Sequence, residues 1–255
     1  MQERQKVPAL VLYDLDHTLL DASEAYTSSL RESLAQNFPR KDFTKVQLGN
    51  SEHSGRNALT NLSEIASEHI NPRIFEDKRD RVMRTWVENY CKSIENGGKI
   101  TAMPGAHKLL DVTENENCIN LVVSSTPKTA IEAGLRKLGM QKRFAAVYGG
   151  ENGKQKIENV REVLRQWLER KDPANIVIIG DSPVEARVAK ELLIRHIGVA
   201  TGLHSVEDLR KESKTSPVFE NLSDTKAVMK EILGHERPQV RLAPNAIKVT
   251  RRKRT

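Results

Sequence analysis

Short apolar runs, each too short for a helix, constrain the fold of this chain most. They are residues 8–13 (PALVLY), Ile119–Val123, Phe144–Tyr148, Ile176–Ile179 and Ile197–Ala200. Short continuous apolar runs are typical of strands that are buried on both faces. Amphipathic helical patterns lie between them, at Thr129–Leu138 and Ile157–Glu169. This alternation predicts an α/β fold with a doubly wound, Rossmann-like parallel sheet.

Residues 22–100 break the alternation. They hold helical patterns and no convincing strand before the turn at Pro104–Gly105, and these patterns cover Ser23–Asn37, Ala58–Glu68 and Arg73–Ile94. An insertion directly after a strand that ends in acids is expected over the carboxyl edge of the sheet, where open α/β sheets bind ligands. We therefore expect residues 1–21 and 101–235 to form the catalytic core and residues 22–100 to form a helical cap.

The net positive charge of the chain comes from its C-terminal end. The formal net charge is +7, from 41 basic and 34 acidic residues. No acid follows Glu236, whereas seven Lys or Arg residues do, so these seven account for the whole net charge. We expect residues 236–255 to be a disordered basic tail. The tail has no aromatic residue for stacking on bases, so we expect at most a weak, nonspecific contact with nucleic acid.

Neither a membrane segment nor a disulfide framework is indicated. No run approaches the roughly 20 apolar residues that a membrane-spanning helix needs, and the N-terminal residues MQERQKVPAL have no apolar core with a cleavage site. Cys91 and Cys118 are the only cysteines, and they lack the spacing of a metal site. We expect a cytoplasmic protein with reduced thiols and no membrane partner.

Two carboxylates follow the first apolar run. Asp14 and Asp16 are two positions apart, so in an extended segment their side chains point the same way. Like charges at this distance repel unless a metal ion lies between them or one of them holds a proton. A solvated turn with two unrelated aspartates is the alternative, which the buried strand before them and the polar groups downstream disfavour.

Hydroxyl groups follow the second apolar run without a gap. Ser124, Ser125 and Thr126 come directly after Ile119–Val123. Their hydroxyl and backbone N–H groups are good donors to phosphate oxygens. A helix N-cap is the other role for these residue types, and one residue can serve both.

A basic segment follows the third run. Lys154 and Lys156 lie just before the helical pattern that starts at Ile157. A lysine at this place can neutralise a phosphoryl group or a nucleophilic carboxylate. Most lysines are simply solvated, so this position indicates a site only together with the others.

The fourth run ends in Gly180 and Asp181, and Glu185 follows four residues on. Mg²⁺ prefers one or two carboxylates together with waters, so an acid here suits a metal ligand. An N-cap for the next helix is the alternative. Because the carboxyl ends of parallel strands meet at one edge, the four strand ends together supply the groups that phosphoryl transfer requires.

In chain order these segments resemble the four sequence motifs of the haloacid dehalogenase superfamily. The motifs are DLDHTLLD at 14–21, LVVSSTP at 121–127, Lys154–Lys156 and GDSPVEA at 180–186. The resemblance spans residues 8 to about 222 and includes MPGAHKLL and IGVATGLHSVEDL. The helical residues between the first motif and the Pro104–Gly105 turn resemble the cap of phosphoglycolate phosphatase and β-phosphoglucomutase relatives.

The resemblance implies a Mg²⁺-dependent phosphohydrolase that cleaves a small phosphate monoester through an aspartyl-phosphate. Asp14 would be the nucleophile, and Asp16 would protonate the leaving oxygen and then activate water. Asp14, the backbone carbonyl of Asp16 and Asp181 would bind Mg²⁺, with Glu185 as a further carboxylate. Dehalogenases and phosphonate hydrolases of this superfamily lack an aspartate at the position of Asp16, which favours phosphate-ester chemistry.

Phosphate binding is carried over to four positions. The resemblance assigns the phosphoryl oxygens to Ser124, Ser125 and a lysine. The third motif lacks the familiar KPxP, and alignment of the following helix favours Lys156, with Lys154 left open. Two other departures are His17 in place of a common glycine, and Glu185 in place of a second aspartate. Glu185 reaches one methylene further, so it would ligate through water or hold Lys156.

Other functions share some of these features. A phosphomutase has every motif and differs in how its cap excludes water. A nucleic-acid-associated end phosphatase would use the basic tail as an anchor. An inactive, partner-binding relative is disfavoured by the retention of Asp14, Asp16 and Asp181. In the cap, the polar loop Gly49–Arg56 would bring His53 or Arg56 to the active site, or it is a plain surface loop, the interpretation that we favour slightly.

Overall fold

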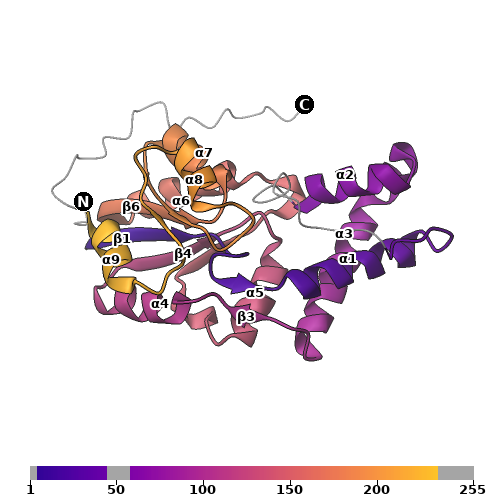
Figure 1. Cartoon of the computed structure of the whole chain (residues 1–255), viewed down its shortest axis with the longest axis horizontal. Helices are drawn as coiled ribbons and strands as arrows, with labels where there is room; N and C mark the ends of the chain where they lie inside the picture. Colours follow the sequence, from indigo (N-terminus) through magenta and orange to yellow (C-terminus); the bar gives the residue numbers. More distant parts are fainter. Residues whose placement is uncertain (1–4, 45–57, 235–255) are drawn as a thin grey trace.

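The computed structural model describes residues 5–44 and 58–234. The loop 49–56, with His53 and Arg56, and the basic segment 236–255 lie outside the described residues. In chain order (Figure 1) the elements are β1 (Gln5–Tyr13), β2 (Leu20–Asp21), α1 (Ser23–Asn37), α2 (Ala58–His69), α3 (Pro72–Glu95), β3 (Thr101–Ala102), α4 (Ala106–Asn115), β4 (Ile119–Val123), α5 (Lys128–Lys137), η2 (Gln141–Arg143), β5 (Ala146–Tyr148), η3 (Glu151–Gly153), α6 (Lys156–Leu168), β6 (Lys171–Gly180), α7 (Pro183–Leu192), β7 (Arg195–Val199), α8 (Val206–Glu212), β8 (Val218–Phe219) and α9 (Thr225–Leu233).

Within the described residues, six strands form a parallel sheet in the order β5-β4-β1-β6-β7-β8. β1 lies between β4 and β6, and its last residue, Tyr13, is in register with Val122 and Ile179. The carboxyl ends of these three strands therefore meet at one edge of the sheet. This arrangement confirms the predicted α/β fold with a helical insertion after the first strand.

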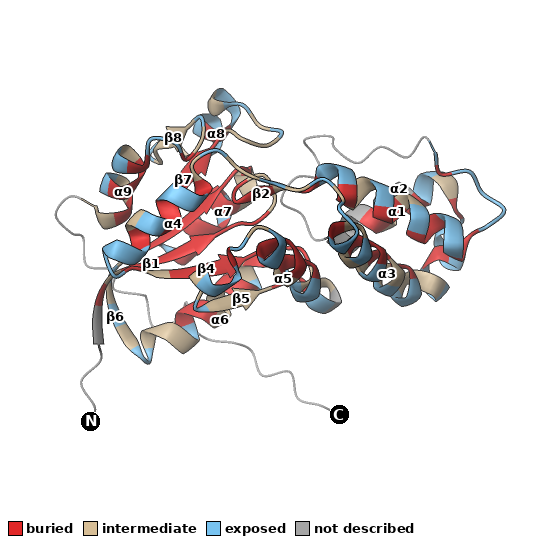
Figure 2. Ribbon diagram, turned by 90° about the horizontal axis from the view of Figure 1, so that it is seen from below, coloured by how far each residue is buried: buried red, intermediate tan, exposed pale blue. Residues whose placement is uncertain are grey.

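Helices cover both faces of the sheet because successive strand residues point to opposite sides. Ala9, Val11 and Tyr13 of β1 belong to an apolar cluster that includes residues of α4, α5 and α9. Leu10 and Leu12 belong to a second cluster with residues of α6 and α7. Figure 2 shows the buried sheet between these two layers. The sheet is thus doubly wound, as predicted.

β1 and β6 are longer than their apolar runs indicate. β6 begins at Lys171, and its polar first half pairs with the start of β1, where Gln5 is in register with Lys171. Pairing of β1 with β4 begins only at Leu10. Pro8, which has no N–H to donate, therefore lies outside the part of β1 that is paired on both sides.

The insertion forms a helical layer that has an apolar cluster of its own and also packs into the cluster of the sheet through Ala25, Tyr90 and Ile94. Helices α1, α2 and α3 pack around their own apolar cluster, which includes Leu34, Phe75 and Trp86. The chain enters and leaves this layer through β2 and β3, which pair antiparallel. Neither strand was predicted, because two residues are too few to show a periodicity. The cap contacts the core through α3 against α5 and through α2 against η3, and Figure 2 shows it beside the sheet.

The two cysteines are free thiols. Burial raises the pKa of Cys118 to about 11. Burial and, to a smaller extent, the charge of Glu95 raise the pKa of Cys91. Both thiols are therefore protonated at neutral pH. Among the described helices, none combines the length and the apolar character that crossing a bilayer would require.

Candidate active site

A buried lysine lies between two buried carboxylates at the edge of the sheet. Lys156 Nζ lies 2.8 Å from Asp14 Oδ1, and it also contacts Glu185 Oε1. Asp14 directly follows β1, and Lys156 is the first residue of α6. Glu185 Oε2 accepts hydrogen bonds from the Ser182 backbone N–H at 3.0 Å and from its hydroxyl at 2.6 Å, in a capping box that starts α7. Both oxygens of Glu185 therefore have protein donors.

Burial and charge shift the titration of these groups. Burial raises the pKa of Asp14 to about 7, although the charge of Lys156 opposes the shift. Burial, followed by the charge of Asp14, raises the pKa of Asp181 well above its ordinary value. Burial also acts to raise the pKa of Glu185, but the charge and hydrogen bond of Lys156 outweigh it and lower that pKa. Lys156 thus contacts two of the three buried acids, Asp14 and Glu185.

This acidic cluster suits a divalent cation. Carboxylate oxygens of Asp14, Asp181 and Glu185 lie within 4.8 Å of one another. Asp181 Oδ2 is buried and has no hydrogen-bond partner within the described part of the chain. A Cβ atom on Gly202 would lie 1.9 Å from this oxygen, so only glycine leaves room for the carboxylate. Because Lys156 and Ser182 donate hydrogen bonds to both oxygens of Glu185, the carboxylate oxygens that are more available to a cation are those of Asp14 and Asp181.

The loop after β4 brings its hydroxyl groups to the same edge. Ser124 N–H donates to the Tyr148 carbonyl at 3.0 Å, and Ser124 Oγ accepts from the Thr126 N–H at 3.0 Å. Thr126 Oγ1 donates to Asp16 Oδ2 at 2.7 Å. Ser125 is also buried. In the sequence Thr126 is only part of a hydroxyl run, and no sequence signal indicates its contact with Asp16.

The turn after Asp16 explains one departure from the resemblance. His17 has φ +59°, in the left-handed region where glycine is common. Its N–H donates to the Leu20 carbonyl at 2.7 Å, and its own carbonyl accepts from the Thr201 hydroxyl. Histidine is among the residue types enriched at positive φ, so the turn is kept with this side chain.

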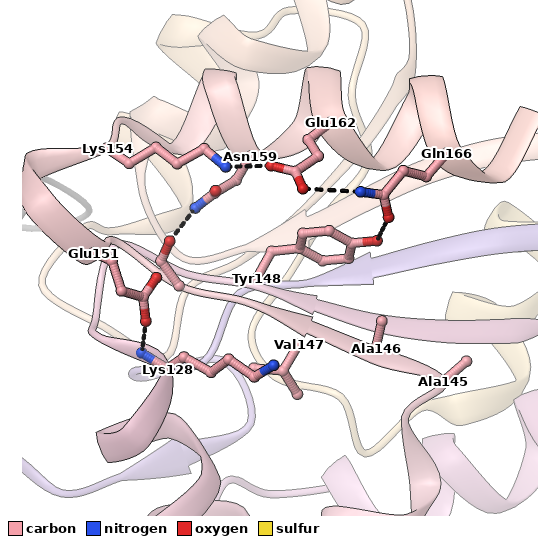
Figure 3. Close-up of a pocket in the computed structure, with 11 residues that line it drawn as sticks. Lys128, Ala145, Ala146, Val147, Tyr148, Glu151, Lys154, Asn159, Glu162 and Gln166 are labelled. Atoms are coloured by element: carbon pink, nitrogen blue, oxygen red, sulfur yellow. Dashed lines mark hydrogen bonds and ion pairs between the residues drawn. The ribbon is translucent and has the colours of Figure 1, made fainter.

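Of the two candidate lysines, the structure brings Lys156 to Asp14. Lys154 instead pairs with Glu162 of α6. Lys154 and Glu162 line a cavity of about 460 Å³ between α6 and the edge strand β5 (Figure 3). The lining of this cavity does not include Asp14, Asp16 or Asp181. This cavity is therefore distinct from the candidate active site.

Two tyrosines of an aromatic cluster in the cap lie close enough to Asp16 for its charge to act on them. The rings of Tyr26 and Trp86 are 4.8 Å apart, and those of Tyr26 and Tyr90 are 6.5 Å apart. Burial, followed by the charge of Asp16, raises the pKa values of Tyr26 and Tyr90. The Tyr90 hydroxyl is buried without a partner among the described residues. These residues carry no distinctive sequence signal, because aromatic residues at helical spacing are also typical of an ordinary core.

Comparison with known families gives a clear match. The model of the haloacid dehalogenase-like hydrolase family matches residues 11–199. This range contains Asp14, Asp16, Ser124, Ser125, Lys154, Lys156, Asp181 and Glu185.

Individual relatives agree with the family match. A phosphorylated carbohydrates phosphatase of Thermotoga maritima is 25% identical over 209 residues, which are 78% of this chain and 87% of the relative. Phosphoglycolate phosphatase 1 of Pseudomonas aeruginosa is 22% identical over 223 residues, which are 86% of this chain and 79% of the relative. The crystal structure of CbbY from Rhodobacter sphaeroides in complex with phosphate has the same fold, with a TM-score of 0.66 and 18% identity over 86% of this chain and 96% of that one.

Proposed function

Since this chain belongs to the haloacid dehalogenase-like hydrolase family, in its helically capped branch, we propose that it is a Mg²⁺-dependent phosphatase that cleaves a phosphate monoester through an aspartyl-phosphate. The observation that carries the proposal is the buried triad of Asp14, Lys156 and Asp181. Lys156 holds one oxygen of Asp14 at 2.8 Å, and Asp181 presents a buried oxygen without a partner beside it.

In the proposed reaction Asp14 attacks phosphorus in line. A bond forms between an Asp14 carboxylate oxygen and phosphorus while the bond from phosphorus to the leaving oxygen breaks. Asp16 gives its proton to that leaving oxygen. In the second step Asp16 takes a proton from water, the water oxygen bonds to phosphorus, and the Asp14 carboxylate is released.

Binding of the phosphoryl group falls to the donors at the same edge. Ser124 and Ser125 would donate to its oxygens, and Lys156 would offset its negative charge. Lys154 is a weaker candidate for this role because it pairs with Glu162. Glu185 fits the positioning of Lys156 better than direct ligation, since both of its oxygens have protein donors.

A divalent cation fits the same acids. Asp14, the Asp16 carbonyl and Asp181 would hold Mg²⁺, and Glu185 would contribute through water. When bound, Mg²⁺ supplies the positive charge that lowers the repulsion between a carboxylate nucleophile and a phosphate dianion.

The substrate class is a small phosphorylated molecule. The two relatives named above are a phosphatase of phosphorylated carbohydrates and a phosphoglycolate phosphatase, so sugar phosphates and phosphoglycolate head the panel of esters to test. Transfer of the phosphoryl group to a second hydroxyl group, in place of release to water, would identify a phosphomutase.

The deciding experiment measures phosphate release from such a panel with and without Mg²⁺. Asp14→Asn should lower turnover by more than about 1,000-fold, because an amide keeps the shape of the side chain and is a far weaker nucleophile. Asp172→Asn, at an exposed position of β6, is the matched control and should leave turnover unchanged. Turnover of Asp14→Asn within a few-fold of the wild type would rule out the proposed nucleophile.

A further inference from the structure

Thr126 makes a hydrogen bond that the reaction outlined above does not use. Thr126 is a buried residue, and its hydroxyl donates to Asp16 Oδ2 at 2.7 Å, across a sequence separation of 110 residues. The other polar atoms of Thr126 are also engaged. Its N–H donates to Ser124 Oγ at 3.0 Å, and its carbonyl accepts from Gly150 N–H at 2.9 Å. Thr126 therefore links Asp16 to the loops that follow β4 and β5.

The loop that carries Thr126 is held in place from the neighbouring strand. A Cβ atom on Gly149 would lie 2.9 Å from the Thr126 carbonyl oxygen and 2.5 Å from the Lys128 nitrogen, so the two loops are in close backbone contact. The Glu151 carboxylate accepts from the Lys128 N–H. The Asn159 amide donates to the Gly149 carbonyl at 2.7 Å. These contacts leave the Thr126 hydroxyl little freedom to move away from Asp16.

We propose that Thr126 is a positioning residue that orients the acid–base carboxyl of Asp16. The proposal rests on the phosphatase function proposed above. Because Thr126 donates to Oδ2, Oδ1 is the oxygen that is left to carry the proton for the leaving group. Oδ1 is then the oxygen that gives this proton to the leaving group as the bond between phosphorus and the leaving oxygen breaks, and Asp16 remains as a carboxylate.

Electrostatics places the same carboxyl group close to the cap. The charge of Asp16 acts on Tyr26 of α1 and on Tyr90 of α3, in addition to their burial. Asp16 thus interacts with the cap through its charge and with the loop after β4 through its hydrogen bond to Thr126.

This role predicts that the effect of Thr126 depends on the leaving group. A poor leaving group needs its proton from Asp16 during bond cleavage, so a misplaced carboxyl slows the step. 4-Nitrophenolate leaves readily without protonation, so its cleavage is insensitive to the position of Asp16. A residue that only supported the fold would affect both esters equally.

The test compares 4-nitrophenyl phosphate with phenyl phosphate in the full-length protein with Mg²⁺. Thr126→Val keeps the shape of the side chain and removes the donor, and it should lower kcat for phenyl phosphate by about 10- to 100-fold. The loss for 4-nitrophenyl phosphate should be less than about threefold. Thr126→Ser, which restores a hydroxyl group, should recover most of the loss. Thr126→Ala gives a second variant without the hydroxyl group, for use if valine lowers the melting temperature.

Two outcomes would overturn the proposal. An equal loss for both esters, or a loss that Thr126→Ser does not restore, would show that Thr126 only supports the fold. Unchanged kinetics for both esters would show that the hydrogen bond has no role in the reaction. Asp14→Asn, measured on the same two esters, separates these failures from a failure of the proposed function. An active Asp14→Asn would overturn the phosphatase mechanism and the role of Thr126 with it.

Discussion

Lys156 Nζ lies 2.8 Å from Asp14 Oδ1, and this buried ion pair also engages Glu185. Removing the lysine would leave two buried carboxylates without their counter-ion. Lys156→Met should therefore lower the free energy of unfolding by about 3–5 kcal/mol, as is typical when one partner of a buried pair is removed. Urea unfolding monitored by circular dichroism measures this change.

Lys154→Met is the matched control for that measurement. Lys154 pairs with Glu162 at a position where both side chains are 33% exposed. Exposed pairs of this kind contribute less than about 1 kcal/mol. Equal losses for the two lysine variants would contradict a special role for the pair of Lys156 with Asp14.

Mg²⁺ should stabilise the folded protein as well as activate it. Binding of a cation to the native state raises the melting temperature, and at Mg²⁺ concentrations far above Kd the rise should be about 5 °C or more. Asp181→Asn removes the carboxylate whose Oδ2 lacks a partner within the described residues, so it should abolish most of the rise. Differential scanning fluorimetry with Mg²⁺ and with EDTA checks the expectation independently of activity.

Gly202 gives a second way to disturb the same carboxylate. Gly202→Ala places a Cβ atom 1.9 Å from Asp181 Oδ2, so the carboxylate must move and the Mg²⁺ concentration needed for stabilisation should rise at least about tenfold. Gly198→Ala is the control, since its Cβ atom would meet a methyl group of Val218 at 3.1 Å and its three nearest atoms do not include an atom of Asp181. Similar Mg²⁺ requirements in the two alanine variants would argue against Asp181 as a ligand.

Replacement of Leu193 by glycine should stabilise the folded protein. It ends α7 in the left-handed conformation, with φ +55°, and is 61% exposed. A leucine in this conformation is strained and packs little here, whereas glycine is favoured at helix C-termini. Leu193→Gly should raise the free energy of unfolding by about 0.5–1 kcal/mol. Leu203→Gly, at another exposed leucine that lacks a positive φ, should give no gain, and a gain there would remove the conformational explanation.

Removal of residues 237–255 should leave melting temperature and turnover of small esters nearly unchanged. The seven basic residues and the absence of acids in this segment make its contribution electrostatic. Any binding of the full-length protein to DNA should weaken steeply with salt and disappear on truncation. Retained DNA affinity in the truncated protein, measured by fluorescence anisotropy, would place the nucleic-acid contact in the core.

Much of the fold could be predicted because each central strand is an apolar run of its own. Tyr13, Val123 and Gly180 end strands β1, β4 and β6, and the polar residues after them reach one edge by topology alone. The strand β8 (Val218–Phe219) was not predicted, because it is two residues long and pairs only with β7. Short strands take their conformation from a neighbour and leave no periodic signal.

The sequence predicts which residues form the candidate site, but it does not predict which of their side chains contact one another. The motif order indicated Asp14, Asp16 and Asp181, whereas the choice between Lys154 and Lys156 depends on where α6 begins and how it faces β1. The pairing of Glu185 with Lys156 was one of two alternatives left open, and the structure shows that contact. The hydrogen bond from Thr126 to Asp16 joins two turns, and turn geometry is set by tertiary contacts that a single sequence does not reveal.

The short ribbon of β2 and β3 bears on how such a protein is assembled. Asp21 is paired with Thr101, and Leu20 with Ala102, so the chain leaves the core and returns to it at neighbouring points, about 5 Å apart between paired Cα atoms. Because the helical insertion enters and leaves the core at this one pair of strands, its length can change while the strands of the sheet keep their connections. Its packing against the sheet through Ala25, Tyr90 and Ile94 must then be kept.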